Sequence, residues 1–311
     1  MKSLVISGGG SKGAFAGGVV QYLKENGSDW DMFAGTSTGS LIIPLVACNK
    51  VDVLKDAYTN IVPEDIFKIN PFRIIKQKNG NIRFGINHFK IACNFIFNGS
   101  KTLGDSSNLR NTVCRFLSET DFNEIKNSDK EVIVTVCNLT LETLEIKSIK
   151  DETYDDFCDW MCASSSAAPF MSVVTKNKYD YIDGGMLRFI PLIEAIEMGS
   201  TEIDAIVLME DHDEGHSERV TNVLQLLTKM IRIFLGSRKR HDADVQMLSK
   251  NIDDDREVRL RIYFLPDKLT NNPYVFNKEM MLKWWDMGYS NAKELNYSEY
   301  ILTKRKVKKI I

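Results

Sequence analysis

The chain has 311 residues and a net charge of −2, from 40 basic and 42 acidic side chains. A composition that is 43% hydrophobic, with 7 prolines and 19 glycines, excludes a disordered or collagen-like protein. Because the charges nearly balance, no global field attracts nucleic acid, and we expect no nucleic-acid partner.

The cysteines and the apolar stretches indicate the cellular compartment of the protein. The six cysteines form no C-x-x-C pair, which argues against zinc ribbons and is typical of reduced thiols in the cytoplasm. The first residues reach glycine after a short apolar run and lack the pattern of a signal peptide. Ser40 to Cys48, among the most apolar stretches, is much shorter than the ~20 residues that cross a bilayer. We expect a cytoplasmic protein, with peripheral contact to membranes.

The chain opens with two units of strand, Gly-rich turn and helix. Leu4 to Ser7 reads as a buried strand, and Ala14 to Glu25 follows with apolar residues at helical spacing. Met32 to Ala34 is a second short strand, and Leu41 to Cys48 continues as a buried helix. This alternation favours an α/β fold.

The middle of the chain is less regular. The pattern predicts a helix over Val51 to Asn60 and another over Leu109 to Leu117. Residues 61–101 between them are basic, Asn-rich and aromatic without a sustained period, and we interpret them as an insertion or lid. A hairpin rich in Val, Ile and Thr follows, from Glu131 to Asn138 and from Thr143 to Ile149.

The later elements repeat the α/β alternation. They are a helix over Asp155 to Cys162, a strand over Tyr179 to Ile182, a helix over Leu192 to Met198, a strand over Ile203 to Met209, and helices over Arg219 to Leu235 and Lys278 to Leu295 on either side of a strand over Val258 to Leu265. We predict a core over residues 1–210 and, over residues 211–311, an extension of helices and a strand packed on the same domain.

A glycine-rich turn follows the first strand and reads Gly8-Gly9-Gly10-Ser11-Lys12-Gly13. It satisfies G-x-G-x-x-G, so a dinucleotide site is one interpretation. Such a site needs an acidic residue at the end of the second strand, and that strand ends in Gly35-Thr36-Ser37 instead. Bare backbone N–H groups at a helix start also stabilise a developing oxyanion. We favour this second use.

The second strand ends in a nucleophile-elbow pattern, in which Gly35 and Gly39 flank Ser37 at a spacing of two. Small flanking residues permit the sharp turn that projects a serine hydroxyl above a sheet. The alternative is a small-residue turn in which the serine caps a helix.

A nucleophilic serine needs a base, and two kinds of residue are available. The histidines His88, His212, His216 and His241 lie in an irregular insertion, an acidic loop or a basic run, and not in a Gly-rich catalytic turn. Asp183 stands at a strand end before Gly184 and Gly185, where bare backbone allows close approach. An ordinary Asp-Gly turn is the alternative. Asp183 as the base would require burial, which raises its basicity.

Together these motifs resemble the patatin-like phospholipase family, in the family's order along residues 1–209. The glycine-rich turn matches its oxyanion loop, the elbow matches its nucleophile, and Asp183-Gly184-Gly185 matches its Asp-Gly-Gly turn. Ala163 to Phe170 looks like the small-residue segment that precedes that turn. The last hundred residues carry no resemblance.

The resemblance implies a three-layer α/β/α fold with a central, mostly parallel sheet. It implies that Ser37 attacks an ester, that Asp183 transfers the proton, and that N–H groups around Gly9 and Gly10 stabilise the oxyanion. The implied substrate is a phospholipid, cleaved to fatty acid and lysophospholipid, and neither a metal nor an organic cofactor is implied. A rival is a signalling effector whose core becomes active after ligand binding or self-assembly.

Two further features allow more than one interpretation. His212 and His216, with Asp211 and Asp213, have side chains suited to a divalent metal, or form a solvated acidic loop. The basic clusters 238–240 and 304–311 could attract anionic lipid headgroups, or form a solvated face or a frayed terminus.

Overall fold

The computed structural model describes residues 1–76, 82–209, 226, 230, 247–253, 256–266, 269, 276–304 and 306–310. Its strands are β1 (Lys2–Ile6), β2 (Met32–Thr36), β3 (Phe72–Lys76), β4 (Ile82–Ile86), β5 (Glu131–Asn138), β6 (Thr143–Ser148), β7 (Val174–Lys176), β8 (Tyr179–Asp183), β9 (Glu202–Val207), β10 (Val258–Phe264), β11 (Ser298–Thr303) and β12 (Lys306–Lys309). Its helices are α1 (Gly13–Glu25), α2 (Thr38–Ala47), α3 (Val51–Asn60), α4 (Pro63–Ile66), α5 (His88–Asn98), α6 (Asn108–Phe116), α7 (Glu119–Asn127), α8 (Tyr154–Ser164), α9 (Leu192–Glu197) and α12 (Lys278–Lys293).

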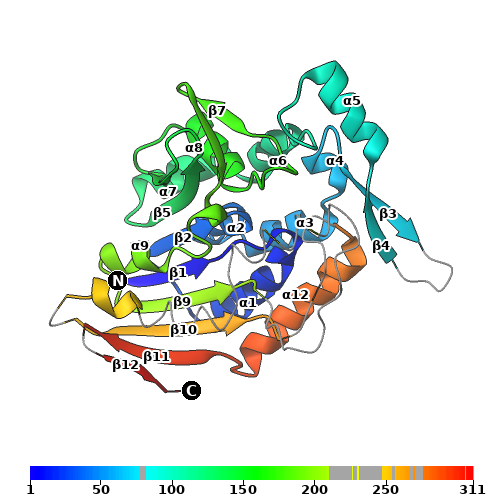
Figure 1. The fold of residues 1–311 in the computed structure, drawn as a ribbon. Coiled ribbons are helices and arrows are strands. Elements are labelled where there is room, and N and C mark those ends of the chain that lie inside the picture. Colours follow the sequence, from blue (N-terminus) through cyan, green and yellow to red (C-terminus); the bar gives the residue numbers. More distant parts are fainter. Residues whose placement is uncertain are drawn as a thin grey trace.

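A mixed sheet forms the centre of the molecule (Figure 1). Within the described residues its order is β12-β11-β10-β9-β1-β2-β5-β8-β7, with β6 also paired to β5. The middle strands β10, β9, β1, β2 and β5 are parallel to one another, and each remaining strand is antiparallel to the neighbours with which it pairs. The expected central, mostly parallel sheet is confirmed.

Both faces of the sheet are covered, because successive strand residues point to opposite sides. In β1, Leu4 and Ile6 belong to a core formed with α1, α2, α3, α8 and α12. Val5 between them belongs to a second core that includes Leu192 and Ile196 of α9. The three-layer α/β/α arrangement is therefore confirmed.

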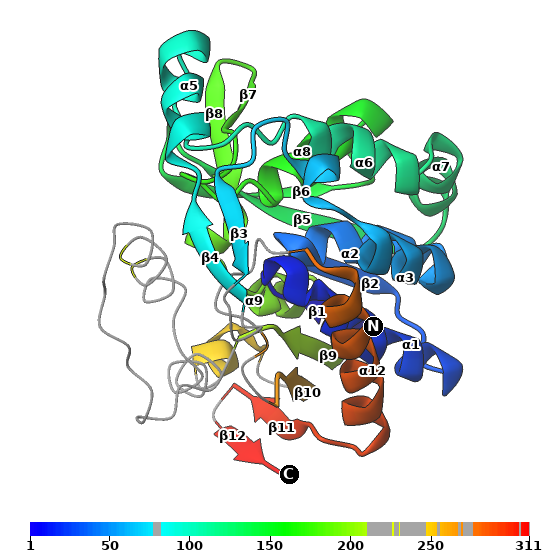
Figure 2. The same cartoon turned by 90° about the vertical axis from the view of Figure 1, so that its right-hand side faces the viewer.

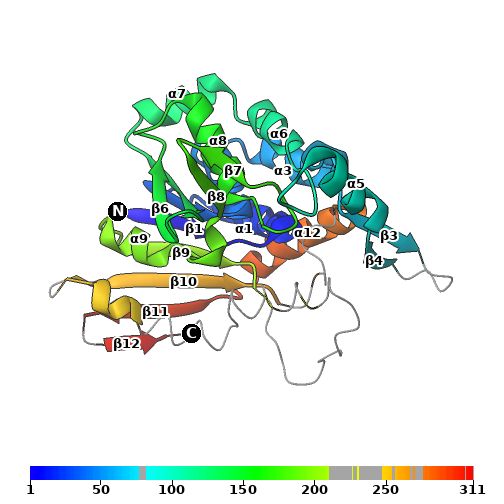
Figure 3. The ribbon, with the colours of Figure 1, turned by 45° about the horizontal axis from the view of Figure 1, so that its top comes forward.

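The C-terminal helix packs directly on the first helix, and α1 and α12 lie side by side in Figure 2. A Cβ on Gly18 would lie 1.9 Å from the carbonyl oxygen of Trp285, so only glycine allows this approach. The Trp285 indole N–H donates to Gln21 at 2.6 Å. After β9 the strands β10, β11 and β12 extend the same sheet (Figure 3).

Most predicted elements are confirmed within one to three residues, whereas α7, β7 and β11 were not predicted. The basic tail is not frayed where the structure describes it: Lys306–Lys309 form the edge strand β12, paired to β11, and the lysines of this strand are exposed. Residues 61–101, predicted to be irregular, contain α4, the β3–β4 hairpin and α5. The predicted helix over Arg219 to Leu235 falls, apart from two residues, outside the described part. No described helix is long and apolar enough to cross a membrane.

Candidate active site

Ser37 lies at a sharp turn between β2 and α2. Its φ of 55° and ψ of −125° are rare for a residue with a side chain and typical of strain held at a functional site. The neighbouring glycines permit the turn, because a Cβ on Gly39 would lie 2.2 Å from the Ile6 carbonyl oxygen and one on Gly35 would lie 2.6 Å from the Gly39 carbonyl group. The turn projects Ser37 half-exposed at the C-terminal edge of the parallel strands.

Serine hydroxyls hold the backbone of Ser37 in this conformation. The Ser37 N–H donates to the Ser164 hydroxyl at 3.0 Å. The Ser37 carbonyl accepts from the hydroxyls of Ser40 at 2.6 Å and Ser165 at 3.1 Å. The small-residue segment after α8 thus supports the elbow, a role that the sequence pattern did not reveal.

Asp183 reaches Ser37 because β2 and β8 share one edge of β5. Thr135 of β5 pairs with Thr36 on one side and with β6 on the other. The next residue, Val136, pairs with Asp183 on one side and again with β6 on the other. Because β6 pairs with one edge of β5 at both of these residues, β2 and β8 must both pair with its other edge, one after the other along the strand. The chain therefore brings Asp183 to the point where Ser37 leaves the sheet.

Burial changes the acidity of Asp183. Only 8% of the residue is exposed, and this burial raises its pKa from the ordinary 3.8 to about 6. Hydrogen bonds from the Ser37 hydroxyl and the Gly185 N–H, the latter at 2.7 Å, lower the pKa and offset only part of the rise. Gly184 lets the chain turn here, because a Cβ on it would lie 2.3 Å from the Thr135 carbonyl oxygen. The carboxylate is thus a stronger base than in water.

The glycine-rich turn lies against the serine. A Cβ on Gly8 would lie 3.2 Å from the Ser37 Cβ, and one on Gly9 would lie 2.5 Å from the Leu208 Cβ. The short 3₁₀ turn Gly10–Lys12 then leads into α1. The helices α1 and α2 both begin at this site, and helix N-termini favour negative charge.

The N–H groups of this turn differ in their availability. Those of Gly8, Lys12 and Gly13 donate to backbone carbonyls, including Gly8 to Phe189 at 3.2 Å. Those of Gly9 and Gly10 have no acceptor among the described residues, and both glycines line the cavity beside Ser37. Ser11 is buried beneath the turn. Two of the six predicted positions thus combine a free N–H donor with access to the site.

A cavity of about 220 Å³ opens beside Ser37 and Asp183. A single water needs only ~10–15 Å³, so the space suits an organic group. Most of its wall is apolar, and its side chains include Leu41 and Leu45 of α2, Ile66 of α4, Leu109, Val113 and Phe116 of α6, and Met161 of α8. The i, i+4, i+7 spacing on α6 is the sequence signal for this wall, although it does not reveal what the helix faces.

Comparison with known proteins identifies the family. The model of the family described as "Patatin-like phospholipase" matches residues 4–196. The chain belongs to the patatin-like phospholipase family. The match contains Ser37 and Asp183, and membership supports lipid acyl hydrolysis as the general activity.

Comparisons with solved structures and with curated proteins do not narrow the function further. The crystal structure of VipD from Legionella pneumophila is similar to this patatin-like chain at 15% sequence identity and a TM-score of 0.45, over 96% of this chain and 67% of VipD. No match is found among curated proteins.

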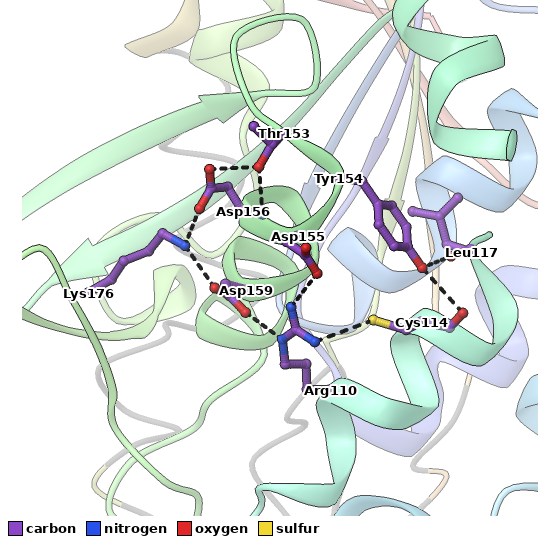
Figure 4. Close-up of polar contacts among 9 residues, drawn as sticks. All are labelled: Arg110, Cys114, Leu117, Thr153, Tyr154, Asp155, Asp156, Asp159 and Lys176. Atoms are coloured by element: carbon purple, nitrogen blue, oxygen red, sulfur yellow. Dashed lines mark hydrogen bonds and ion pairs between the residues drawn. The ribbon is translucent and has the colours of Figure 1, made fainter. Parts of the chain in front are cut away.

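A network of ion pairs links α6 and α8, two helices that line the cavity of this patatin-like protein (Figure 4). Arg110 of α6 binds Asp155 at 2.8 Å and Asp159 at 2.7 Å, both on α8. Lys176 of β7 binds Asp159 at 2.7 Å and Asp156 at 2.5 Å. Asp159 therefore lies between two cations and links α6, α8 and β7.

The remaining candidates for chemistry lie elsewhere. No histidine is among the described residues that line the cavity, and His88 is exposed at the start of α5. The acidic loop with His212 and His216, His241 and the basic cluster 238–240 fall outside the described residues. Within the described residues, no three His, Cys, Asp or Glu side chains form a group that could hold a metal ion.

Proposed function

We propose that the protein is a phospholipase of the A type, which cleaves fatty-acyl esters of phospholipids through a dyad of Ser37 and Asp183. The observation that carries the proposal is the buried Asp183 carboxylate, hydrogen-bonded to the Ser37 hydroxyl, with both residues lining an apolar cavity. The cavity suits an acyl chain, and a water-poor site strengthens both the base and the oxyanion donors.

In the first step, the Ser37 Oγ attacks the ester carbonyl carbon while Asp183 accepts its proton. The carbonyl oxygen becomes an oxyanion, which accepts hydrogen bonds from the N–H groups of Gly9 and Gly10. One such donor typically contributes ~2.7–4 kcal/mol to the stability of the transition state. The tetrahedral intermediate then breaks its bond to the alcohol oxygen, and Asp183 returns the proton to the departing lysophospholipid.

In the second step, water attacks the acyl group on Ser37. Asp183 accepts a proton from this water, and the same N–H donors stabilise the second oxyanion. Collapse of the intermediate releases the fatty acid and returns the proton to the Ser37 Oγ. The elbow held by Ser164 and Ser165 fixes Ser37 through both steps.

The test is release of fatty acid from phosphatidylcholine vesicles by the purified full chain. Ser37→Ala and Asp183→Asn should each reduce release by about a thousandfold or more, because the two residues act as a unit. Asp180→Asn is the matched control: this carboxylate lies on the same strand but is bonded to Lys101 at the surface. It should leave release unchanged.

Vesicles labelled separately in each acyl chain identify the ester that is cleaved. Accumulation of one lysophospholipid supports the A-type assignment. Release that survives either dyad change would contradict the proposed mechanism, and release from neutral glycerides with none from phospholipids would contradict the proposed substrate.

A further inference from the structure

Helix α5 exposes two large apolar side chains to solvent and buries a polar one. Among the side chains of α5 that the structure describes, the buried one is polar: Asn94 is 1% exposed and donates to the Thr102 carbonyl at 3.0 Å. Phe89 and Ile96 are 78% and 74% exposed. They lie seven residues apart, two helical turns, and therefore share a face. An apolar face turned to solvent marks a site of interaction rather than a core.

The chain around α5 carries charge of one sign. Between Asp65 and Asp105 there is no acidic residue, although the whole chain has more acidic than basic side chains. Residues 66–76 and 82–104, here called the basic arm, contain Lys68, Arg73, Lys76, Arg83, Lys90 and Lys101. Of these, Lys68, Arg73, Lys90 and Lys101 are exposed. Such an arm is complementary to a surface of uniform negative charge.

The basic arm is connected to the wall of the cavity. The ring of Phe72, at the start of β3, lies 6.1 Å from that of Phe67 and 5.4 Å from that of Phe170. Phe67 and Phe170 both line the cavity. In Figures 1 and 2, β3, β4 and α5 project on the side toward which β1 and β9 run. Ser37 directly follows β2, which is parallel to β1, and therefore lies at the same edge of the sheet. A surface bound by the arm would therefore lie near the active site.

We propose that the basic arm binds the surface of an anionic lipid bilayer. Phe89 and Ile96 enter the boundary between headgroups and acyl chains, while the exposed side chains of Lys68, Arg73 and Lys90 bind lipid phosphates. A helix with an apolar face and basic flanks lies in the interface in this way. The inference rests on the proposed function in one respect, because the bilayer contains the substrate, but binding itself requires no hydrolysis.

Vesicle flotation of the full chain tests the inference. Every form carries Ser37→Ala, so that the vesicles stay intact, and the vesicles are phosphatidylcholine alone or with about one third phosphatidylglycerol. Phe89→Ser with Ile96→Ser should weaken binding to both kinds of vesicle by at least about tenfold, since two large apolar side chains no longer enter the bilayer. Lys68→Glu, Arg73→Glu and Lys90→Glu together should weaken binding by about tenfold or more, on the phosphatidylglycerol vesicles alone.

Matched controls change other exposed residues elsewhere in the protein. Met198→Ser with Leu295→Ser removes two exposed apolar side chains near the ends of α9 and α12. Lys306→Glu, Lys308→Glu and Lys309→Glu in β12 change the net charge as much as the triple change in the arm. Both controls should bind like the parent.

Three outcomes would overturn the inference. The first is that the arm variants bind vesicles as well as the parent does, and the second is that the controls lose as much binding as the arm variants. The third is that Phe89→Ser with Ile96→Ser lowers the mass of the protein in solution but leaves vesicle binding unchanged, which would mean that the apolar face of α5 serves self-association. The parent with Ser37 intact is tested separately on a water-soluble short-chain ester. Failure there contradicts the proposed function and leaves the binding result standing.

Discussion

The Ser164 hydroxyl accepts a hydrogen bond from the Ser37 N–H at 3.0 Å, although 127 positions separate the two residues. Ser164 is fully buried, so without this hydroxyl the N–H would lose its partner inside the protein. The end of α8 thus helps to hold the elbow between β2 and α2.

Ser164→Ala should lower kcat on a soluble ester by about tenfold and reduce the free energy of unfolding by ~1–3 kcal/mol, the cost of an unsatisfied buried donor. Steady-state kinetics and thermal unfolding measure the two effects. Ser166→Ala is the control, because its buried hydroxyl donates to the Cys162 carbonyl and not to Ser37. An equal loss of kcat in both variants would refute a specific role for Ser164.

The raised pKa of Asp183 predicts the pH profile of hydrolysis. Only the ionised carboxylate can accept the Ser37 proton, so kcat/KM should rise tenfold per pH unit below about pH 6 and level off above it. Rates on a soluble ester between pH 4 and pH 9 measure the profile. A midpoint near the ordinary value of 3.8 would show that burial does not set the basicity of the site.

The same burial predicts that the dyad reduces stability. Because the folded pKa of Asp183 lies above its unfolded value of 3.8, the folded state loses stability as pH rises from 3.8 to about 6, and the loss then stays constant. Asp183→Asn, which cannot ionise, should therefore be more stable than the parent at pH 8, by up to about 3 kcal/mol. Denaturant unfolding at pH 4 and pH 8 tests this. A stability difference that does not grow with pH contradicts the prediction.

The apolar cavity predicts a preference for acyl length. Val113 is 6% exposed and lines the cavity from α6, so Val113→Phe should fill part of it. The ratio of long-chain to short-chain ester hydrolysis should fall by about tenfold. Val62→Phe adds the same bulk at an exposed position near α4 and should leave the ratio unchanged. A ratio unchanged in Val113→Phe would mean that the acyl chain lies elsewhere.

The charged network between α6 and α8 predicts a moderate effect on stability. Asp159→Asn removes the anion shared by Arg110 and Lys176, and the side chain is 29% exposed, so solvent screens part of the loss. We expect a cost of about 1 kcal/mol and a fall in Tm of about 2–4 °C. Lys2→Gln removes an exposed ion pair, in which the Lys2 Nζ lies 3.8 Å from a carboxylate oxygen of Glu202, and should leave Tm unchanged. Equal values of Tm for the two variants would show that the network does not hold the wall.

The sequence predicted the elements around Ser37 and Asp183 because local signals mark them: glycines, short apolar runs and helical spacing. It could not predict how the two residues meet, since that depends on β8 pairing with the same edge of β5 as β2. The strand β12 was missed because its lysines suggest a frayed tail, although exposed lysines also suit an edge strand. The reversed exposure of α5 was also hidden, because its apolar residues look the same in sequence whether they face a core or solvent.

Thr36 and Asp183 pair with successive residues of β5, and this arrangement has a consequence for the synthesis of the protein on the ribosome. When the ribosome has synthesised the chain only through α7, Ser37 is present. The strand β5, with which the strand of Asp183 must pair, has not yet been made. On the proposed mechanism, a nascent chain cannot attack lipids until β8 has emerged and paired, since translation proceeds from the N-terminus. Truncated products that end before residue 183 should accordingly be harmless to the membranes of the cell that makes them.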